Sequence, residues 1–318
     1  MKHDEMQDVR LASYRRVLKL MGNRFEFTVV ADNENWANDQ IDSAISEVQR
    51  IEKLLTTFSD DSQTNEINRN AGIKPVRVDE EVFGLIARSL KISDLTQGAF
   101  DISYGSIDKK LWNFDANMTS LPSVEVAKQA VKLINYKNII LDASNTTVFL
   151  KEKGMRIGFG GIGKGYAADS AKRLLQANRV MSGIVNAAGD LISWGTQPNN
   201  LPWTVAIADP DQSTVPFSRL NISGMAIATS GNYEKYVTID GKKYSHTIDP
   251  TTGLPISGIK SVSIISPSAE LSDAMATPVM VMGVKVGLDL INQLNHMACI
   301  IVDDHNKIHS SHNINIKN

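Results

Sequence analysis

Predicted strands and helices follow one another along this chain without the regular strand–helix–strand rhythm of a parallel sheet, and this order constrains the fold most strongly. Apolar residues at helical spacing predict helices at 36–55, 80–92, 124–134, 166–177 and 268–294, the last interrupted at Pro278 and Gly283. Short apolar runs between turn residues predict strands at 24–30, 138–141, 147–150, 183–186, 203–207, 226–229, 235–239, 243–248, 261–265, 299–302 and 307–310. The mixture predicts an α+β fold.

Length and composition set the scale of this fold. The chain has 318 residues, 42% of them hydrophobic, which is enough for one large domain or two fused halves. We expect a polar N-terminal lead over 1–19, a single domain over 20–318 and a polar loop at 56–72. A formal net charge of -2 does not provide the basic surface of a nucleic-acid-binding protein. The single cysteine, Cys299, rules out a disulfide framework and a cysteine zinc site.

The lengths of the apolar segments bear on the cellular location of the protein. No apolar run is read as long enough to span a membrane, and the charged N-terminus lacks the apolar segment of a signal peptide. We therefore expect a cytoplasmic protein with no membrane span.

The residues from Gly158 to Gly165 form a glycine-dense segment ahead of a predicted helix. The segment fits G-x-G-x-x-G, but it lies mid-chain and lacks an acid at the spacing that a dinucleotide fold requires. Gly165 stands where a P-loop needs the Ser or Thr that holds Mg²⁺. Glycines here would let backbone N–H groups approach a phosphate, or would let a strand and a helix pack tightly. The sequence leaves both alternatives open.

Asp273 and Thr277 form a second candidate constellation. They are four residues apart, so on a helix they share one face and present a carboxylate with a hydroxyl, ligands that suit Mg²⁺. Helix capping by Ser272 or Asp273 is the alternative. Pro278 disfavours helical geometry at Thr277 and is expected to affect how that hydroxyl is presented.

His246 and Asp249 form the third constellation. His246 ends a predicted strand and precedes the turn sequence Asp249-Pro-Thr-Thr-Gly253. A histidine in this setting serves as a general base, holds a phosphate, or simply bonds to the turn. The other histidines are scattered over the termini and the last hairpin, which argues against a zinc or iron triad.

Taken in order, these segments resemble the FAD:protein FMN transferase (ApbE) family over most of the chain, from about Leu20 to Gly283. Each motif is weak alone, and their order and spacing make the resemblance specific. The motifs lie at 21–22, 62–68, 98–101, 158–169, 186–190, 228–233, 246–253 and 272–277.

The resemblance implies an ApbE-like fold in which FAD lies extended in a cleft between two mixed α/β subdomains. It implies Mg²⁺ on the pyrophosphate, held by the side chains of Asp273 and Thr277 and the carbonyl of Gly161. A Thr or Ser hydroxyl on an acceptor flavoprotein subunit of a redox complex would attack FAD, release AMP and retain FMN. His246 is the candidate base and Asp249 its orienting partner. The implied FAD contacts are Met21, Phe58, Asn68, Ala99, Phe100, Asp101, Lys164, Thr229, His246 and Ile248.

Three positions depart from the family pattern. Gly158 replaces a frequent acid, Ala188 replaces the first glycine of a pair, and Ile102-Ser103 replaces Pro-Thr. Members are also commonly exported and lipid-anchored through an N-terminal cysteine, which this sequence lacks. A periplasmic or membrane-anchored location would follow only if an export signal had been removed.

Three other functions are compatible with parts of this pattern. An FAD pyrophosphatase would use the same site with water as the nucleophile. A flavin-binding protein without turnover would bind FAD independently of Mg²⁺, and Asp273 with Thr277 argues against it. A nicotinamide-dependent oxidoreductase would need a parallel sheet at the glycine segment.

Overall fold

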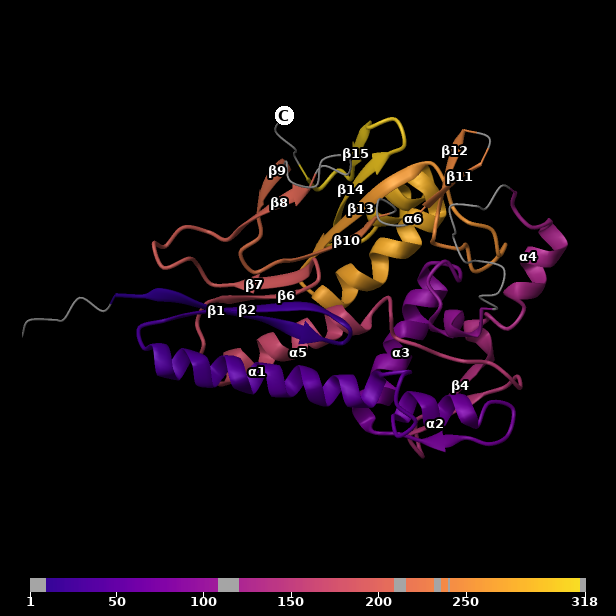
Figure 1. Cartoon of the computed structure of the whole chain (residues 1–318), viewed down its shortest axis with the longest axis horizontal. Helices are drawn as coiled ribbons and strands as arrows, with labels where there is room; N and C mark the ends of the chain where they lie inside the picture. The colour runs from indigo at the N-terminus through magenta and orange to yellow at the C-terminus, as the bar shows by residue number, and fades with distance from the viewer. Residues whose placement is uncertain (1–9, 108–119, 209–215, 232–235, 240, 315–318) are drawn as a thin grey trace, which may run out of the picture.

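The computed structural model describes residues 10–107, 120–208, 216–231, 236–239 and 241–314, and an eight-stranded sheet lies at its centre (Figure 1). The strand order is β1-β2-β6-β7-β10-β13-β14-β15. The strands are β1 (Ala12–Leu20), β2 (Asn23–Ala31), β6 (Gly183–Ala187), β7 (Asp190–Trp194), β10 (Ala226–Gly231), β13 (Ile259–Ser266), β14 (Ala298–Asp303) and β15 (Ile308–Ser310). Every pairing in this sheet is antiparallel, which confirms the α+β class and contradicts the parallel arrangement that the oxidoreductase alternative needs.

Strand β1 corrects the expectation of a polar lead. Residues 12–20 pair along their whole length with β2, from Ala12 opposite Ala31 to Leu20 opposite Asn23. Its side chains alternate between exposed and half-buried, as an edge strand with one covered face requires. Residues 1–9 of the expected lead lie outside the described residues.

Both faces of the sheet carry core residues, and successive residues of a strand point to opposite faces. Val29 and Ile264 belong to the main core on one face. Their chain neighbours Val30 and Ile265 belong to a smaller core on the other face, together with Trp203. The smaller core is covered by the hairpin of β8 (Thr204–Ala208) and β9 (Pro216–Asn221).

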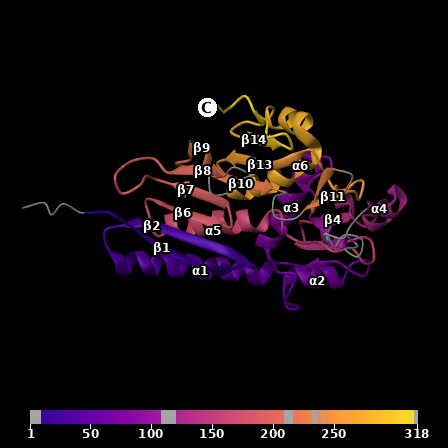
Figure 2. The ribbon, with the colours of Figure 1, turned by 45° about the horizontal axis from the view of Figure 1, so that its top comes forward.

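Three helices cover the main face: α1 (Glu34–Leu55), α5 (Gly163–Ala177) and α6 (Ala269–Ile291). α1 packs on β1 and β2, α5 on β6 and β7, and α6 on β10 and β13, with α5 between the other two helices. In Figure 2, α1 lies below β1 and β2, and α5 lies below β6 and β7. α1 begins after Asn33, whose side chain accepts a hydrogen bond from the N–H of Trp36.

Helix α6 differs from its prediction in two ways. It continues in helical conformation through Pro278 and is irregular only at Gly283, where φ is 81°. Of the helices in the described ranges, it alone is long and apolar enough to cross a membrane, so the expectation that no segment reaches that length is wrong. Its contacts with α5, β10 and β13 account for its apolar character, because they place it in the core.

A second group of elements lies beside the large sheet, towards the magenta helix α4 in Figure 1. In a three-stranded sheet of order β3-β5-β4, β5 is in contact with α2, while α3 contacts η1 and α6. A separate hairpin pairs β11 with β12. These elements are β3 (Val76–Arg77), β4 (Ile139–Asp142), β5 (Thr147–Leu150), α2 (Gln63–Arg69), α3 (Glu80–Leu95), η1 (Ile102–Ser106), α4 (Val124–Ala130), η3 (Tyr136–Asn138), β11 (Tyr236–Ile239) and β12 (Lys242–Ser245). The main core includes residues of α2, α3, β3, β4 and β5 as well as of the large sheet, and the division into two subdomains stays a prediction.

Candidate functional site

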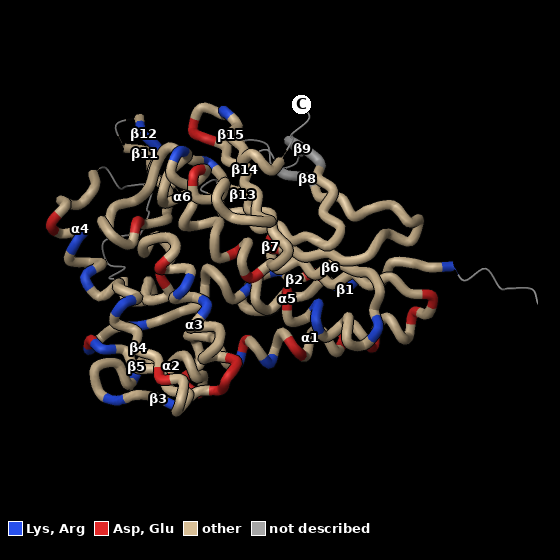
Figure 3. The backbone as a smooth tube through the Cα atoms, turned by 180° about the vertical axis from the view of Figure 1, so that it is seen from behind, with Lys and Arg blue, Asp and Glu red and all other residues tan. Residues whose placement is uncertain are grey.

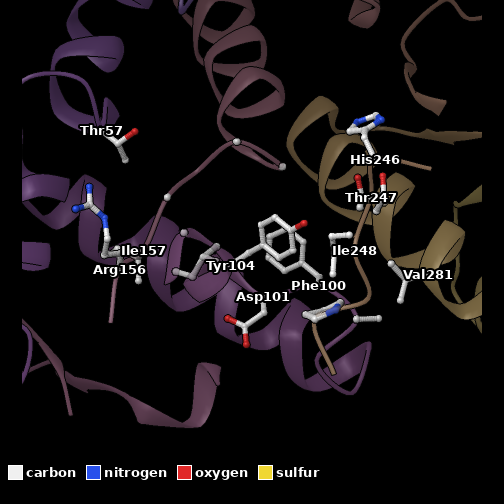
Figure 4. A pocket seen from close by; sticks show the side chains of 18 of the residues that line it. Thr57, Phe100, Asp101, Tyr104, Arg156, Ile157, His246, Thr247, Ile248 and Val281 are labelled. Carbon is white, nitrogen blue, oxygen red and sulfur yellow. The ribbon is translucent and has the colours of Figure 1, made fainter. Parts of the chain in front are cut away.

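A cavity of about 740 Å³ lies beside α6, and its volume is within the usual range for a small-molecule site. Its walls come from the glycine segment, from 99–105 around η1, from 246–250 after β12 and from α6. Figure 4 shows Phe100 and Tyr104 in its middle, with Arg156 to one side and Ile248 and Val281 to the other. The cavity therefore brings together chain segments that are far apart in the sequence.

The glycine segment has two structural roles. Gly158, Gly160 and Gly161 line the cavity, where their backbone is open to a ligand. Gly165 lies where α5 meets α6, and a Cβ atom there would be 2.1 Å from the carbonyl oxygen of Ala269. The close-packing alternative is thus correct for Gly165, although it joins two helices rather than a strand and a helix.

A buried charge cluster lies where α5, β7 and α6 meet. The Nζ of Lys164 lies 2.7 Å from Oδ2 of Asp190 and 3.4 Å from Oδ1 of Asp273. Burial would lower the pKa of Lys164, but the two carboxylates raise it. Burial, and then the charge of Asp273, raise the pKa of Asp190. One ammonium is shared by two carboxylates that oppose each other's ionisation, and a divalent cation bound beside Asp273 would relieve that repulsion.

Asp273 and Thr277 share one face of α6, as the spacing predicts. The Oδ2 atom of Asp273 accepts a hydrogen bond from the N–H of Gly165 at 3.0 Å. The hydroxyl of Thr277, one turn later, lies 3.0 Å from that of Ser230 and lines the cavity with Gly161. The capping alternative does not apply, because Ser268 caps α6.

This donor set fits Mg²⁺. A carboxylate, a hydroxyl and a backbone carbonyl are hard oxygen ligands, and Mg²⁺ commonly binds one or two carboxylates together with substrate phosphates. Within the described ranges, no three His, Cys, Asp or Glu side chains form a group that could hold a metal. A cation bound here would therefore depend on Asp273, Thr277, Gly161 and oxygens of the substrate.

His246 and Ile248 line the cavity from the segment after β12. The backbone N–H of Ile248 bonds to the phenol of Tyr104, whose pKa is raised by burial. Asp249 is directed into its own turn, where Oδ1 accepts hydrogen bonds from the N–H and the hydroxyl of Thr251 at 2.8 and 2.7 Å. These bonds account for Asp249 as a turn residue, and its orienting role stays a prediction.

The predicted FAD contacts divide into two groups. Phe58, Ala99, Phe100, Asp101, His246 and Ile248 line the cavity; Met21, Asn68, Lys164 and Thr229 do not. Phe58 is 99% exposed, so its ring is available to a ligand. Asp101 is buried, and its carboxylate accepts hydrogen bonds from both the N–H and the hydroxyl of Ser103 and from the N–H of Tyr136. Burial raises the pKa of Asp101, and these bonds oppose that effect.

The family is decided by comparison with known proteins. The model of the ApbE family matches residues 21–301, which is most of the chain. The chain belongs to the ApbE family. Among curated ApbE relatives, the FAD:protein FMN transferase of Klebsiella pneumoniae (strain 342) is 30% identical over 299 residues, covering 93% of this chain and 90% of the relative. That of Escherichia coli (strain K12) is 32% identical over 248 residues, covering 76% and 70%.

Solved ApbE structures share the whole fold. The apbe protein of Thermotoga maritima superposes with a TM-score of 0.84 at 30% identity, covering 95% of this chain and 98% of the other. The flavinyl transferase ApbE of Pseudomonas stutzeri, in its apo form, also gives 0.84, at 26% identity, covering 96% and 97%. The expected ApbE-like fold is therefore confirmed.

Some site residues were not predicted from the ApbE motifs. Asp190 was noted only as part of a motif, and its ion pair with Lys164 depends on the approach of β7 to α5. Arg156 and Tyr104 line the cavity without any local sequence signal. Asp169, also in a motif, has a structural role: its carboxylate accepts hydrogen bonds from the N–H groups of Ala269 and Glu270 and fixes the start of α6.

Asn68 braces the cavity wall instead of lining it. Its Oδ1 accepts from the N–H of Ile157 at 2.7 Å and its Nδ2 donates to the carbonyl of Ile157 at 3.0 Å. We expect Asn68→Ala to lower the free energy of unfolding by about 2 kcal/mol, because both backbone groups lose their partner. Urea denaturation measures this, with Asn70→Ala as the control, because Asn70 makes one bond within α2's last turn. Equal losses in the two variants would contradict the bracing role.

Proposed function

We propose that this protein transfers FMN from FAD to a Thr or Ser hydroxyl of an acceptor flavoprotein, with Mg²⁺ as cofactor and AMP as the leaving product. The observation that supports it most is the meeting of Gly161, Thr277 and His246 at one cavity, with Asp273 one turn from Thr277. The names of the relatives, FAD:protein FMN transferase, support the substrate and the reaction class. The protein is accordingly a transferase.

The reaction exchanges one phosphorus–oxygen bond for another. The acceptor hydroxyl oxygen forms a bond to the phosphorus on the FMN side, and the anhydride bond to the AMP phosphate breaks. The hydroxyl proton passes to a ring nitrogen of His246, and AMP leaves with the electron pair of the broken bond. Flavin remains attached to the acceptor through a phosphoester.

Asp273, Thr277 and the carbonyl of Gly161 would hold Mg²⁺ beside the pyrophosphate. When bound, Mg²⁺ neutralises charge that develops on the phosphoryl group and on the departing AMP. Lys164 keeps Asp273 in place through its contact at 3.4 Å, and the N–H of Gly165 fixes the carboxylate from the other side. The chain thereby presents a carboxylate whose position is set before any ligand arrives.

The cavity walls suit an extended flavin nucleotide. Phe100, Tyr104 and Ile248 provide an apolar surface for a flat ring, and exposed Phe58 adds a further aromatic face. Arg156 supplies positive charge for a phosphate at one side. Gly158, where the family pattern frequently has an acid, has no side chain, so only its backbone faces the cavity.

Replacement of His246 by alanine tests the proposed base. We expect the rate of FMN transfer at saturating FAD to fall about 100-fold or more, since general base catalysis contributes roughly that factor. Single-turnover transfer, followed by in-gel flavin fluorescence of the acceptor, measures the rate. The control is His305→Ala, because His305 is exposed on the β14–β15 hairpin and does not line this cavity. Transfer at the full rate in His246→Ala would remove this residue from the mechanism.

A further inference from the structure

A second cavity, of about 620 Å³, adjoins the proposed active site. The two cavities share Asp101 and Pro250 as a common wall. The second is lined by Lys128 and Lys132, from α4 and the turn after it, and by Lys137 from η3. In Figure 3, blue segments mark the lysines on α4 and just beyond it.

Three lysines and two acids line this cavity, and the ammonium of Lys137 lies 5.7 Å from the ring centroid of Tyr136. Among the described residues, no ion pair within 4.0 Å joins Lys128, Lys132 or Lys137 to an acid; Glu125 acts on Lys128 only electrostatically. The two acids that line the cavity already have partners. Asp101 accepts hydrogen bonds from Ser103 and from Tyr136, and Asp94 accepts one from the hydroxyl of Tyr136 at 3.2 Å.

One turn of the chain contributes to the walls of both cavities. Pro250 and Thr251 line the second cavity, and they belong to the turn that follows Ile248. This turn sits directly on α4, since a Cβ atom on Gly253 would be 2.1 Å from the carbonyl oxygen of Ala127. Ile248 packs with Ile107 and Val131 in a small core beneath. An occupant of the second cavity would therefore touch the same turn that leads back to His246.

We infer that this lysine-lined cavity binds an acidic segment of the acceptor protein, close in sequence to the target Thr or Ser. The inference rests on the proposed function. The target hydroxyl belongs to the acceptor. For it to reach the first cavity, the acceptor chain next to the target residue must cross the surface of this protein near the cavity. If it crosses at the wall that Asp101 and Pro250 share between the two cavities, an acidic side chain a few residues away reaches the lysines, because an extended chain advances about 3.3–3.6 Å per residue. Complementary charge would then set acceptor preference and association rate.

The triple variant Lys128→Ala/Lys132→Ala/Lys137→Ala tests this inference with a recombinant acceptor domain. We expect the KM for the acceptor to rise about 10-fold, with kcat at saturating acceptor and the dissociation constant for FAD unchanged. The KM of the wild type should rise with salt, and that of the variant should depend on salt much less. The matched control is Lys19→Ala/Lys53→Ala/Lys74→Ala, because these lysines are exposed and none lines either cavity.

Charge reversal provides a second arm. Changing the three lysines to glutamate should raise the acceptor KM further, and changing the acidic residues beside the acceptor's target to lysine should restore it in part. An unchanged acceptor KM in the alanine variant would overturn this inference and leave the proposed function standing. If that variant also bound FAD more weakly, the cavity would be assigned to FAD. No transfer by the wild-type protein would overturn the proposed function and this inference together.

Discussion

Asp273→Asn is expected to lower the rate of FMN transfer roughly 1,000-fold while the fold is retained. The amide keeps an oxygen that can accept the N–H of Gly165 but removes the negative charge that the proposed Mg²⁺ needs. Lys164 keeps its closer partner, Asp190, at 2.7 Å. The free energy of unfolding should therefore change by about 1 kcal/mol or less. The rate is measured from AMP release and from acceptor labelling in the same sample.

Glu270→Gln is the matched control for this prediction. Glu270 is a second buried acid on α6, and its carboxylate pairs with Arg88, with Nε–Oε1 at 2.6 Å, away from the cavity. The control should lose stability and keep its transfer rate. Near-wild-type transfer by Asp273→Asn, with Mg²⁺ still required, would show that another residue holds the cation.

Gly165→Ala should have the largest effect on stability. Alanine usually favours a helix over glycine by about 1 kcal/mol, but here its Cβ would lie 2.1 Å from the carbonyl oxygen and 2.6 Å from the carbonyl carbon of Ala269. Both are backbone atoms, so α5 and α6 must separate. We expect the free energy of unfolding to fall by about 3 kcal/mol or more, since the displaced backbone outweighs the gain in propensity.

Gly160→Ala separates this clash from the general effect of adding a methyl group. No atom lies within 4 Å of a Cβ on Gly160, and its φ is not in the left-handed region. Its unfolding midpoint in urea should stay close to that of the wild type. If both glycine variants unfold at the same urea concentration, then the close approach of α5 and α6 does not require glycine at position 165.

The elements predicted most accurately are those whose apolar periodicity is visible within the element itself. Helix α1 was placed over 36–55 and runs over Glu34–Leu55, because its apolar residues recur on one face for many turns. Strand β1 was missed, because Arg15 and Lys19 lie on its exposed side and its strand character depends on pairing with β2. Helix α2 lies within the predicted polar loop at 56–72, because it is only 7 residues long and polar, and its capping by Ser62 is its main local signal.

Part of the candidate site could be predicted from local spacing. The shared helix face of Asp273 and Thr277 follows from helical spacing, and the structure adds that Pro278 does not interrupt their helix. Their role as Mg²⁺ ligands comes from the family resemblance and stays a prediction. The roles of Asn68, Thr229 and Asp249 depend on their partners. Asn68 bonds to Ile157, Thr229 to Ser263 at 2.8 Å and Asp249 to Thr251. Ile157 and Ser263 are distant in sequence, so no local pattern distinguishes a brace from a ligand contact.

Intact-mass measurement of a recombinant acceptor domain, incubated with the protein, FAD and Mg²⁺, tests the central claim most directly. The account predicts acceptor whose mass increases by one phosphoester-linked FMN, with one AMP released per acceptor, and loss of both when EDTA is added or when Asp273→Asn replaces the wild type. AMP released while the acceptor mass stays unchanged would contradict transfer and indicate a pyrophosphatase. Bound FAD with no AMP released would contradict both reactions and leave a flavin-binding protein.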